Sequence, residues 1–274
     1  MLIDFHTHTT ASDGALRPAE LLERARYRGV QVLAITDHDT QRGFNEAAVA
    51  APSDLRLVSG IELSCVWSGV TLHVVGLGYR AGDQALLGLE ESLLLARETR
   101  AREIAERLAR KGFPGALEGA RRIAGNATLC RPHFAHWMVE AGHVETVGKA
   151  FGKWLGRGKV GDVKAAWPHL TDAVAAIRES GGLPVLAHPL KYGLTRTKLR
   201  ALCEAFAACG GAAIEVVNGR QSTDEINQLR RLALDFSLAA SLGSDFHRDA
   251  EYGTDLGICS TLVGEVPNIL GQVL

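Results

Sequence analysis

Histidines and acidic residues recur in this chain directly after short apolar segments, where together they could bind metal ions. The first motif is His6-Thr7-His8. Residues i and i+2 of a strand point to the same face, so both imidazoles could bind one cation. Asp245-Phe246-His247 repeats this spacing with one oxygen and one nitrogen donor. A single pair of possible ligands at this spacing is most often incidental, so a metal site can be predicted only if other motifs supply further ligands.

Three further motifs place a possible ligand at the end of an apolar segment. His38 follows Val32–Ile35, Glu62 follows Leu57–Ile61, and His188 follows Val185–Ala187. Capping of a following helix would explain an aspartate or threonine after His38, but it does not explain the imidazole. A carboxylate at the position of Glu62 could bridge two cations, because each of its oxygens can bind a different ion.

Two more residues are weaker candidates. His73 lies inside the apolar segment Thr71–Val75, where a single histidine is more often a hydrogen-bonded core residue. Asp13, in Ala11-Ser12-Asp13-Gly14, could equally be an ordinary turn aspartate. Six of the ten histidines nevertheless fall into these motifs, and a purely structural role would scatter them over both ends of the strands and over the helices.

The elements that must position these residues alternate between strands and helices, which favours a parallel sheet or a barrel. In a barrel the carboxyl ends of the strands meet at one face, so the ligands listed above should converge. The expected strands are Leu2–His6, Gln31–Thr36, Leu55–Glu62, Thr71–Gly76, Leu183–His188, Ala212–Val217, Leu238–Gly243 and, near the end, Ile258–Leu262. The expected helices between them are Pro18–Gly29, Gln41–Ala51, Leu170–Gly181, Lys198–Cys209 and Thr223–Asp235.

The middle of the chain has helical patterns and no convincing strand. We expect helices over Gly82–Lys111, Ala116–Ile123, Pro132–Ala141 and Val144–Leu155. The predicted organisation is therefore a first barrel part over residues 1–81, an all-helical insertion over 82–164, and a second barrel part over 165–274. The insertion could cap the strand ends, or it could be a purely structural outer layer.

The composition excludes several classes of function. The net charge is −1, so no global field draws the protein to long nucleic acid or to an anionic membrane. No apolar run is long enough to span a bilayer, and a strand at Leu2 leaves no leader peptide. Five widely spaced cysteines without a CxxC motif indicate reduced thiols and a cytoplasmic protein. The sequence does not indicate an oligomeric state.

The nine candidate ligands suit two or three divalent ions that share bridging groups. Imidazoles and carboxylates without a thiolate favour Mn²⁺, Zn²⁺ or Fe²⁺. Closely spaced cations polarise a phosphoryl oxygen and activate water, although similar clusters also serve amide hydrolysis. The candidates are His6, His8, Asp13, His38, Glu62, His73, His188, Asp245 and His247.

Basic residues of the middle segment could bind a phosphate, since guanidinium forks and ammonium groups suit phosphate oxygens. Arg131 and His133 are the best placed, because the start of a helix itself favours anions. Any one of these residues could instead be a solvated surface charge. The candidates are Arg100, Arg102, Arg131, His133, Arg157 and Lys159.

The motifs DFHTHTTASDG, AITDHDT, SGIELS, LAHP and GSDFH together resemble the PHP (polymerase and histidinol phosphatase) family of the amidohydrolase superfamily. The resemblance covers about residues 1–80 and 165–260, in the family's order. It implies a distorted (β/α)₇ barrel and two or three metal ions, most often manganese.

The resemblance also implies a division of the ligands among the ions. His6, His8, Glu62 and Asp245 would hold one ion, and Asp13, His38 and His247 a second. Glu62 would bridge to a third ion that is also held by His73 and His188, a place for which His133 could compete. His247 or Asp245 would assist proton transfer.

The segments TRAREIAERL, CRPHFAHWMVEAG and WLGRGK resemble a bacterial subgroup that hydrolyses phosphate esters of nucleotides. The expected substrate is a 3′,5′-nucleotide bisphosphate that loses its 3′-phosphate, such as adenosine 3′,5′-bisphosphate. The alternatives are 5′→3′ exonucleolytic cleavage of short RNA, a phosphatase acting on histidinol phosphate, and a metal-stabilised binding module without activity.

Overall fold

Residues 1–249 and 254–273 are described in the computed structural model, and they divide into two compact units. We call Met1–Glu90 with Pro168–Leu274 the barrel unit, and Glu91–Trp167 the helical unit. The boundary near residue 90 falls inside the long helix α3 (Gln84–Ala109). Among the helices described here, none combines the length and the apolar character that a membrane span requires.

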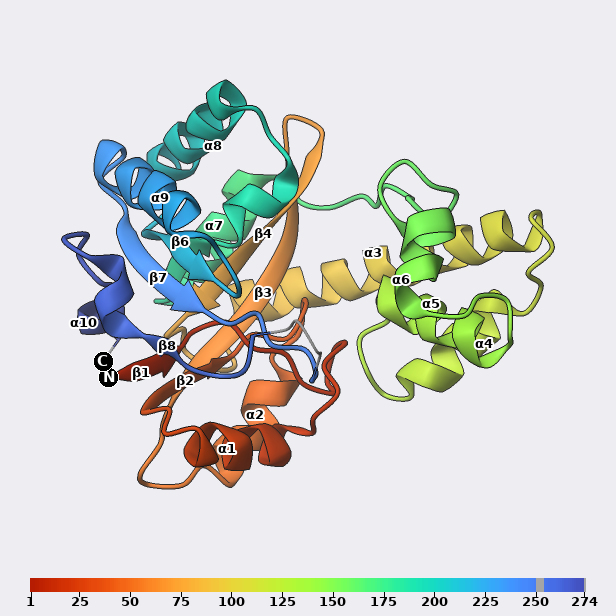
Figure 1. Ribbon diagram of the computed structural model, residues 1–274, viewed down its shortest axis with the longest axis horizontal. Coiled ribbons are helices and arrows are strands. Elements are labelled where there is room, and N and C mark those ends of the chain that lie inside the picture. Colours follow the sequence, from red (N-terminus) through yellow and green to blue (C-terminus); the bar gives the residue numbers. More distant parts are fainter. Residues whose placement is uncertain (250–253, 274) are drawn as a thin grey trace. The chain divides into compact units, whose positions relative to one another are not determined.

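The barrel unit is built on one sheet with the strand order β7-β6-β5-β4-β3-β2-β1-β8 (Figure 1). Neighbouring strands are parallel except at β4, which runs antiparallel to β3 and β5, and at β8, which runs antiparallel to β1. The strands are β1 (Leu2–Asp4), β2 (Val32–Ile35), β3 (Arg56–Trp67), β4 (Val70–Leu77), β5 (Leu183–Leu186), β6 (Ala213–Asn218), β7 (Ala239–Gly243) and β8 (Ile258–Cys259).

Two strands depart from the parallel direction that the alternation of strands and helices favours. Only Ser68 and Gly69 separate β3 from β4, and both have positive φ, at 47° and 76°. A two-residue connection with such angles is a hairpin turn, which joins antiparallel strands and leaves no room for a crossover helix. The expected last strand is also shorter than predicted, because a 3₁₀ turn begins at Ser260.

The sheet closes towards a barrel because β7 returns to β1. The backbone N–H of Phe5 donates to the carbonyl of Leu242 at 3.0 Å. Beyond the strand ends, the N–H of Asp245 donates to the carbonyl of His6 at 2.9 Å. The first and last metal-ligand motifs of the sequence are therefore neighbours, and the expected distorted (β/α)₇ barrel is confirmed as the fold class.

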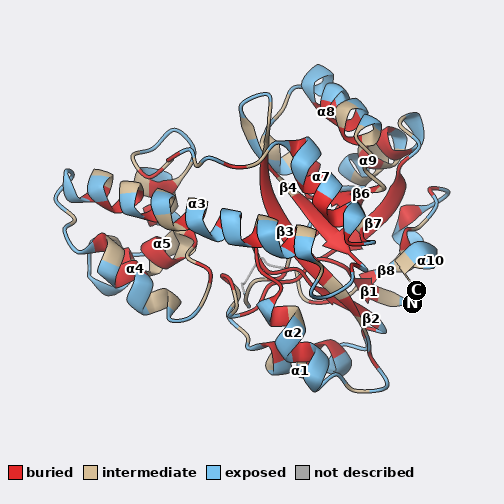
Figure 2. Ribbon diagram, turned by 180° about the vertical axis from the view of Figure 1, so that it is seen from behind, coloured by how far each residue is buried: buried red, intermediate tan, exposed pale blue. Residues whose placement is uncertain are grey.

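Helices cover the outside of this sheet, so the strands are buried while each helix keeps an exposed outer face (Figure 2). Helix α1 begins at Pro18, as a proline in the first helical turn predicts, and buries Leu21 and Leu22 against Leu33 and Ile35 of β2. The helices of the barrel unit are α1 (Pro18–Tyr27), α2 (Arg42–Val49), α7 (Leu170–Glu179), α8 (Arg196–Ala208), α9 (Thr223–Asp235) and α10 (Leu270–Val273).

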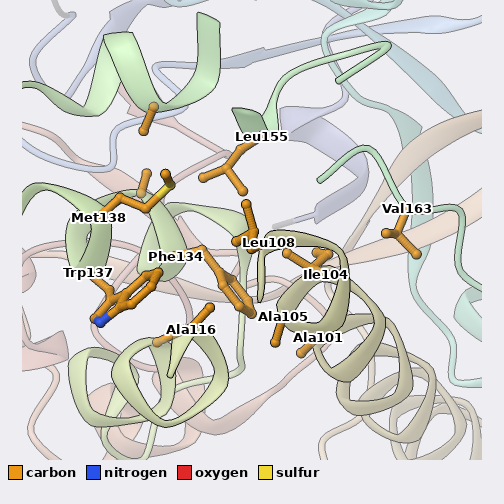
Figure 3. Packing of buried hydrophobic residues seen from close by; sticks show 13 residues of the cluster. Ala101, Ile104, Ala105, Leu108, Ala116, Phe134, Trp137, Met138, Leu155 and Val163 are labelled. Atoms are coloured by element: carbon orange, nitrogen blue, oxygen red, sulfur yellow. The ribbon is translucent and has the colours of Figure 1, made fainter. Parts of the chain in front are cut away.

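The helical unit has its own apolar core, in which Leu108, Phe134 and Leu155 point towards a shared interior (Figure 3). Trp137 lies so close to α4 that a Cβ at Gly119 would be 1.9 Å from its indole ring. Residues 91–167 contain no strand, and the helix expected over Val144–Leu155 is a short α-helix that continues as a π-helical turn, Phe151–Leu155. The unit consists of the rest of α3 with α4 (Ala116–Ala124), α5 (Arg131–Glu140) and α6 (Val147–Ala150).

Candidate metal centre

All nine ligands predicted from the sequence lie in the barrel unit, eight of them on a strand or shortly after one and Asp13 in the loop before α1. They form four groups. Each member of a group offers one nitrogen or oxygen atom as a possible ligand, and these atoms all lie within 4.8 Å of one another. The groups are His8, Asp13, His38 and His247; His6, Glu62 and His188; His6, His8 and Asp245; and His38, Glu62 and His73. Several members belong to two groups, so the whole set is one continuous cluster.

Glu62 reaches this cluster from the middle of β3, not from a strand end as expected. The parallel pairing of β2 with β3 stops at Ile35 and Ser59, while β3 continues for eight residues against β4. The chain after β2 then lies beside Glu62, whose N–H donates to the carbonyl of Asp37 at 3.2 Å. The pairing brings Nδ1 of His38 to 2.8 Å from Oε2 of Glu62.

The carboxylate of Glu62 is the hub of the cluster, because each of its oxygens faces different imidazoles. Oε1 lies 2.9 Å from Nε2 of His188 and 3.0 Å from Nδ1 of His73. On the same side, Nε2 of His6 is 3.3 Å away. Oε2 faces His38 and, at 3.4 Å, Nε2 of His8. A fully buried carboxylate with this many nitrogen neighbours has the arrangement of a bridging ligand.

A second carboxylate, Asp13, gathers another set of imidazoles. Its Oδ1 lies 3.4 Å from Nε2 of His247, 3.9 Å from Nε2 of His38 and 4.0 Å from Nδ1 of His8. The rings of His8 and His247 are stacked with their centroids 4.1 Å apart. Asp13 therefore belongs to the cluster and is not only a turn residue.

The buried atoms of the cluster fit divalent cations. Nδ1 of His8, Nδ1 of His188 and Oε2 of Glu62 are buried without a hydrogen-bond partner in the described part of the chain. Leaving such atoms unsatisfied costs about 1–3 kcal/mol each, more for a charged group. Cations shared by these oxygens and nitrogens would satisfy them, and imidazole with carboxylate suits Mn²⁺, Zn²⁺ or Fe²⁺.

The local charges keep the carboxylates in the ionised form that binds metal. Burial by itself raises the pKa of Asp13, but the neighbouring His38 and His247 outweigh it and hold that pKa well below its usual range. Burial likewise opposes a charge on His247, yet Asp13 raises the pKa of this imidazole to about 9. For His8, burial and the nearby His247 lower the pKa to about 3.

Three supporting residues were not among the sequence predictions. Asp37, within the Thr36-Asp37-His38-Asp39 motif, accepts hydrogen bonds from the N–H of Thr9 at 2.8 Å and the hydroxyl of Ser12 at 2.6 Å. It thereby fixes the loop that carries Asp13. A Cβ at Gly43 would be 1.9 Å from Oδ2 of Asp37, so this close approach requires glycine.

The second is Tyr192, whose hydroxyl lies where the ladder between β4 and β5 ends. It accepts the N–H of His73 at 2.9 Å and donates to the carbonyl of Ala187 at 2.8 Å. The hydroxyl therefore ties the backbone before His188 to that of His73. Glu215 of β6 is a third supporting residue. A carboxylate inside the otherwise apolar segment Ala213–Val217 is the sequence pattern that could have indicated it.

The predicted substrate-binding residues lie in the helical unit, and the structure separates them into different environments. Arg131 begins α5 and lies 3.8 Å from Asp162, while Nε of Arg100 donates to the carbonyl of Val163 at 2.9 Å. Arg102 is paired with Glu98 on an exposed helix surface. Arg157 and Lys159 are exposed in the loop after the π-helical turn.

His133 does not belong to any of the four ligand groups formed by the described residues. Its Nδ1 instead accepts the backbone N–H of Cys130 at 2.9 Å, which caps the start of α5. His188, and not His133, is the imidazole that lies with His6 and Glu62.

Arg97, which the sequence did not single out, completes a cluster of three arginines with Arg100 and Arg131. Its Nη1 donates to Sγ of Cys130 at 3.0 Å, and the guanidinium groups of Arg97 and Arg100 both lie over the ring of Trp167. Burial, together with the charges of Arg131 and Arg97, lowers the pKa of Arg100 to about 10. Three partly buried guanidinium groups in one place favour an anion as their partner.

Comparisons with known proteins agree with this geometry. Residues 4–115 match the model of the PHP domain. The chain is 39% identical to a 5′-3′ exoribonuclease of Haemophilus influenzae over 264 aligned residues. These residues make up 95% of this chain and 96% of the relative. The chain is 40% identical over 257 residues to a 3′,5′-nucleoside bisphosphate phosphatase of Chromobacterium violaceum, covering 93% and 90%.

Among solved structures, an amidohydrolase from Chromobacterium violaceum with bound sulfate and without metal superposes with a TM-score of 0.91 at 37% identity, over 99% of this chain and 95% of that one. The barrel brings histidines and carboxylates into one cluster, and the relatives are a phosphatase and an exoribonuclease. Together these findings define the protein as a metal-dependent phosphoesterase. The chain belongs to the PHP family.

Proposed function

We propose that this protein hydrolyses a phosphate monoester of a nucleotide, and that its substrate is a 3′,5′-nucleotide bisphosphate that loses the 3′-phosphate. The observation that carries the proposal is the shared carboxylate of Glu62, which has imidazoles of His6, His73 and His188 on one oxygen and those of His8 and His38 on the other. Such a hub suits several cations acting on one phosphoryl group.

Three ions would be held as follows. His6, His8, Glu62 and Asp245 would bind the first, Asp13, His38 and His247 the second, and Glu62, His73 and His188 the third. We propose Mn²⁺ in these sites. When bound, such cations balance the charge on the phosphoryl oxygens and lower the pKa of a coordinated water.

Proton transfer is assigned to residues at the open side of the cluster. The side chain of His247 is 29% exposed, so it is the proposed ligand that a leaving ribose oxygen or a water molecule could reach for proton transfer. Asp245 is the second residue assigned to proton transfer, and its Oδ1 lies 3.4 Å from Nε2 of both His6 and His8.

Guanidinium groups suit phosphate oxygens, so we propose that the arginine cluster of the helical unit, in which Arg97 joins the predicted Arg100 and Arg131, binds a phosphate group. Arg102 is less suitable because Glu98 already neutralises it. His133, Arg157 and Lys159 remain proposed contacts to substrate.

The test is release of inorganic phosphate from adenosine 3′,5′-bisphosphate by the protein loaded with Mn²⁺, with AMP as the second product. Adenosine 5′-monophosphate is the matched control, because it lacks the 3′-phosphate and should release little phosphate. Turnover of histidinol phosphate without turnover of the bisphosphate would overturn the substrate assignment. Metal binding without any turnover would indicate a binding module.

A second activity, 5′→3′ cleavage of short RNA, is favoured by the name of the Haemophilus relative. The near-neutral net charge argues against long nucleic acid but not against a few nucleotides. Rates on the mononucleotide bisphosphate and on a 5′-phosphorylated trinucleotide should therefore be compared. A clear preference for the trinucleotide would make exonuclease activity the main function.

A further inference from the structure

Glu215 of β6 is a carboxylate buried beneath the metal-ligand cluster, and it belongs to none of the four ligand groups formed by the described residues. Only 1% of it is exposed. Burying a carboxylate is costly unless hydrogen-bond donors surround it, so its partners should explain its presence.

The first partner is the imidazole of His6. Oε1 of Glu215 lies 2.6 Å from Nδ1 of His6. A carboxylate only accepts hydrogen bonds, so Nδ1 must carry the proton, and Nε2 is left with its lone pair. That nitrogen faces the cluster, 3.1 Å from Nε2 of His8 and 3.4 Å from Oδ1 of Asp245. Glu215 therefore selects the tautomer in which His6 can bind a metal ion.

The second partner is the backbone of another proposed ligand. Oε2 of Glu215 accepts the N–H of His188 at 2.5 Å. His188 has φ +28°, in the left-handed region that non-glycine residues rarely adopt, so its conformation needs support from its surroundings. The same oxygen accepts Nδ2 of Asn218 at 2.9 Å, which fixes the carboxylate in turn.

The neighbouring strand leaves just enough space for this arrangement. A Cβ at Gly243 of β7 would be 2.3 Å from Cβ of His6 and 3.1 Å from Oε1 of Glu215. Glycine at this position therefore allows the imidazole and the carboxylate to meet, and the pair is enclosed on that side.

We propose that Glu215 is a positioning residue of the metal centre, which fixes the tautomer of His6 and the backbone of His188 with its two oxygens. One carboxylate thereby prepares two ligands that belong to different ions. This role rests on the proposed function only in that it requires the cluster to bind divalent cations.

The test is Mn²⁺ binding without substrate, by calorimetric titration and by the electron paramagnetic resonance signal of free Mn²⁺, for the wild type and Glu215→Gln. The two oxygens of Glu215 accept hydrogen bonds from His6, His188 and Asn218. Glutamine has only one acceptor oxygen, so at least one of these three donors loses its partner. We expect the dissociation constant for at least one ion to rise about 10–100-fold, the usual effect of losing such a partner.

Glu90→Gln is the matched control. Glu90 is also a buried carboxylate, 9% exposed, and it accepts hydrogen bonds from Thr40 and Gln41, neither of which is a proposed ligand. If its replacement weakens Mn²⁺ binding as much as Glu215→Gln does, the effect is a general consequence of losing a buried carboxylate, and the positioning role is overturned.

A measurement on the unmodified protein covers the case in which Glu215→Gln does not fold. Nitrogen-15 NMR of labelled histidine should find the proton of His6 on Nδ1 in the wild type loaded with Zn²⁺, a diamagnetic ion, and a proton on Nε2 would overturn the proposal. Equal Mn²⁺ binding by wild type and Glu215→Gln removes the role of Glu215 alone. A wild type that binds no Mn²⁺ instead removes the proposed function itself.

Discussion

The two oxygens of Asp245 face different partners: Oδ1 lies 3.4 Å from Nε2 of His8, whereas Oδ2 forms an ion pair with the ammonium group of Lys191. Lys191 lies in the 3₁₀ turn Pro189–Tyr192 that follows His188, and 54% of its side chain is exposed. A cation bound through Oδ1 would leave this ion pair in place. The ammonium group has three donors, so it can also bind a phosphate oxygen.

We therefore expect Lys191→Ala to weaken substrate binding while leaving the metal content unchanged. A hydrogen bond to a charged group contributes about 1.5–3 kcal/mol, which corresponds to a rise in KM of roughly 10–100-fold. Steady-state kinetics and metal analysis of the same preparation measure both quantities. Lys198→Ala, at an exposed position of α8, is the control and should change neither. A loss of metal with an unchanged KM would mean that Lys191 only orients Asp245.

The sharing of Glu62 predicts that its loss removes more metal than the loss of Asp13. Glu62 is a member of two ligand groups, while Asp13 is a member of one. We expect Asp13→Asn to lose about one ion per chain and Glu62→Gln about two, because each replaced carboxylate withdraws a charged oxygen from its groups. Metal analysis after dialysis against trace Mn²⁺ measures the stoichiometry. Equal losses in the two variants would contradict the bridging role.

The chemistry at the strand ends could be read from the sequence because it depends on local patterns. An apolar strand followed by His6, His38 or His188 places an imidazole at the carboxyl end of that strand, and parallel strands bring these ends together. The fold class could be predicted for the same reason. The direction of β4 could not be predicted, because the alternation of strands and helices does not indicate strand direction. The hairpin at Ser68 and Gly69 reverses the chain, so β4 runs antiparallel to both β3 and β5.

Residues that support the ligands were missed because their partners are distant in the sequence. Glu215 is 209 positions from His6, and Lys191 is 54 positions from Asp245. Nothing within β6 shows which side chain its carboxylate will meet. Arg97 lies in a helix rich in charges, and what distinguishes it from exposed neighbours such as Arg102 is its contact with Trp167 and its hydrogen bond to Cys130, both distant in the sequence.

Removal of metal should destabilise the folded protein. Without cations, the ionised carboxylates of Asp13, Glu62 and Asp245 remain buried close together, and the cations bind the folded state only. An ion present at 100 times its dissociation constant stabilises the fold by about 2.7 kcal/mol. For a chain of this size, that corresponds to a rise in Tm of roughly 5–10 °C per ion.

Thermal unfolding in EDTA and in Mn²⁺ measures this difference. Glu62→Gln serves as the control, because a variant with fewer ions should gain less from added Mn²⁺ than the wild type does. A wild-type Tm that is the same in EDTA and in Mn²⁺ would contradict a metal site built from these buried groups.

Asp4 should make the stability of the metal-free protein fall as the pH rises from about 4 to 6. Its buried carboxylate accepts the backbone N–H groups of Ser244 and Gly257, both at 2.9 Å. Burial nevertheless raises its pKa from 3.8 to about 6. The folded protein then holds this proton more tightly than the unfolded chain does. The associated stability is complete below pH 3.8 and is lost as the pH rises through 6.

A shift of this size corresponds to about 3 kcal/mol, because one pKa unit is about 1.36 kcal/mol. Asparagine at position 4 cannot titrate, so the free energy of unfolding of the wild type minus that of Asp4→Asn should fall by most of this amount between pH 4 and pH 7, in EDTA. Urea denaturation at each pH measures it. Asp54→Asn is the control, because the exposed ion pair with Arg26 lowers the pKa of Asp54 and the difference should move weakly in the opposite direction. A difference for Asp4→Asn that stays constant with pH would mean that the backbone donors to Asp4 offset the cost of burial.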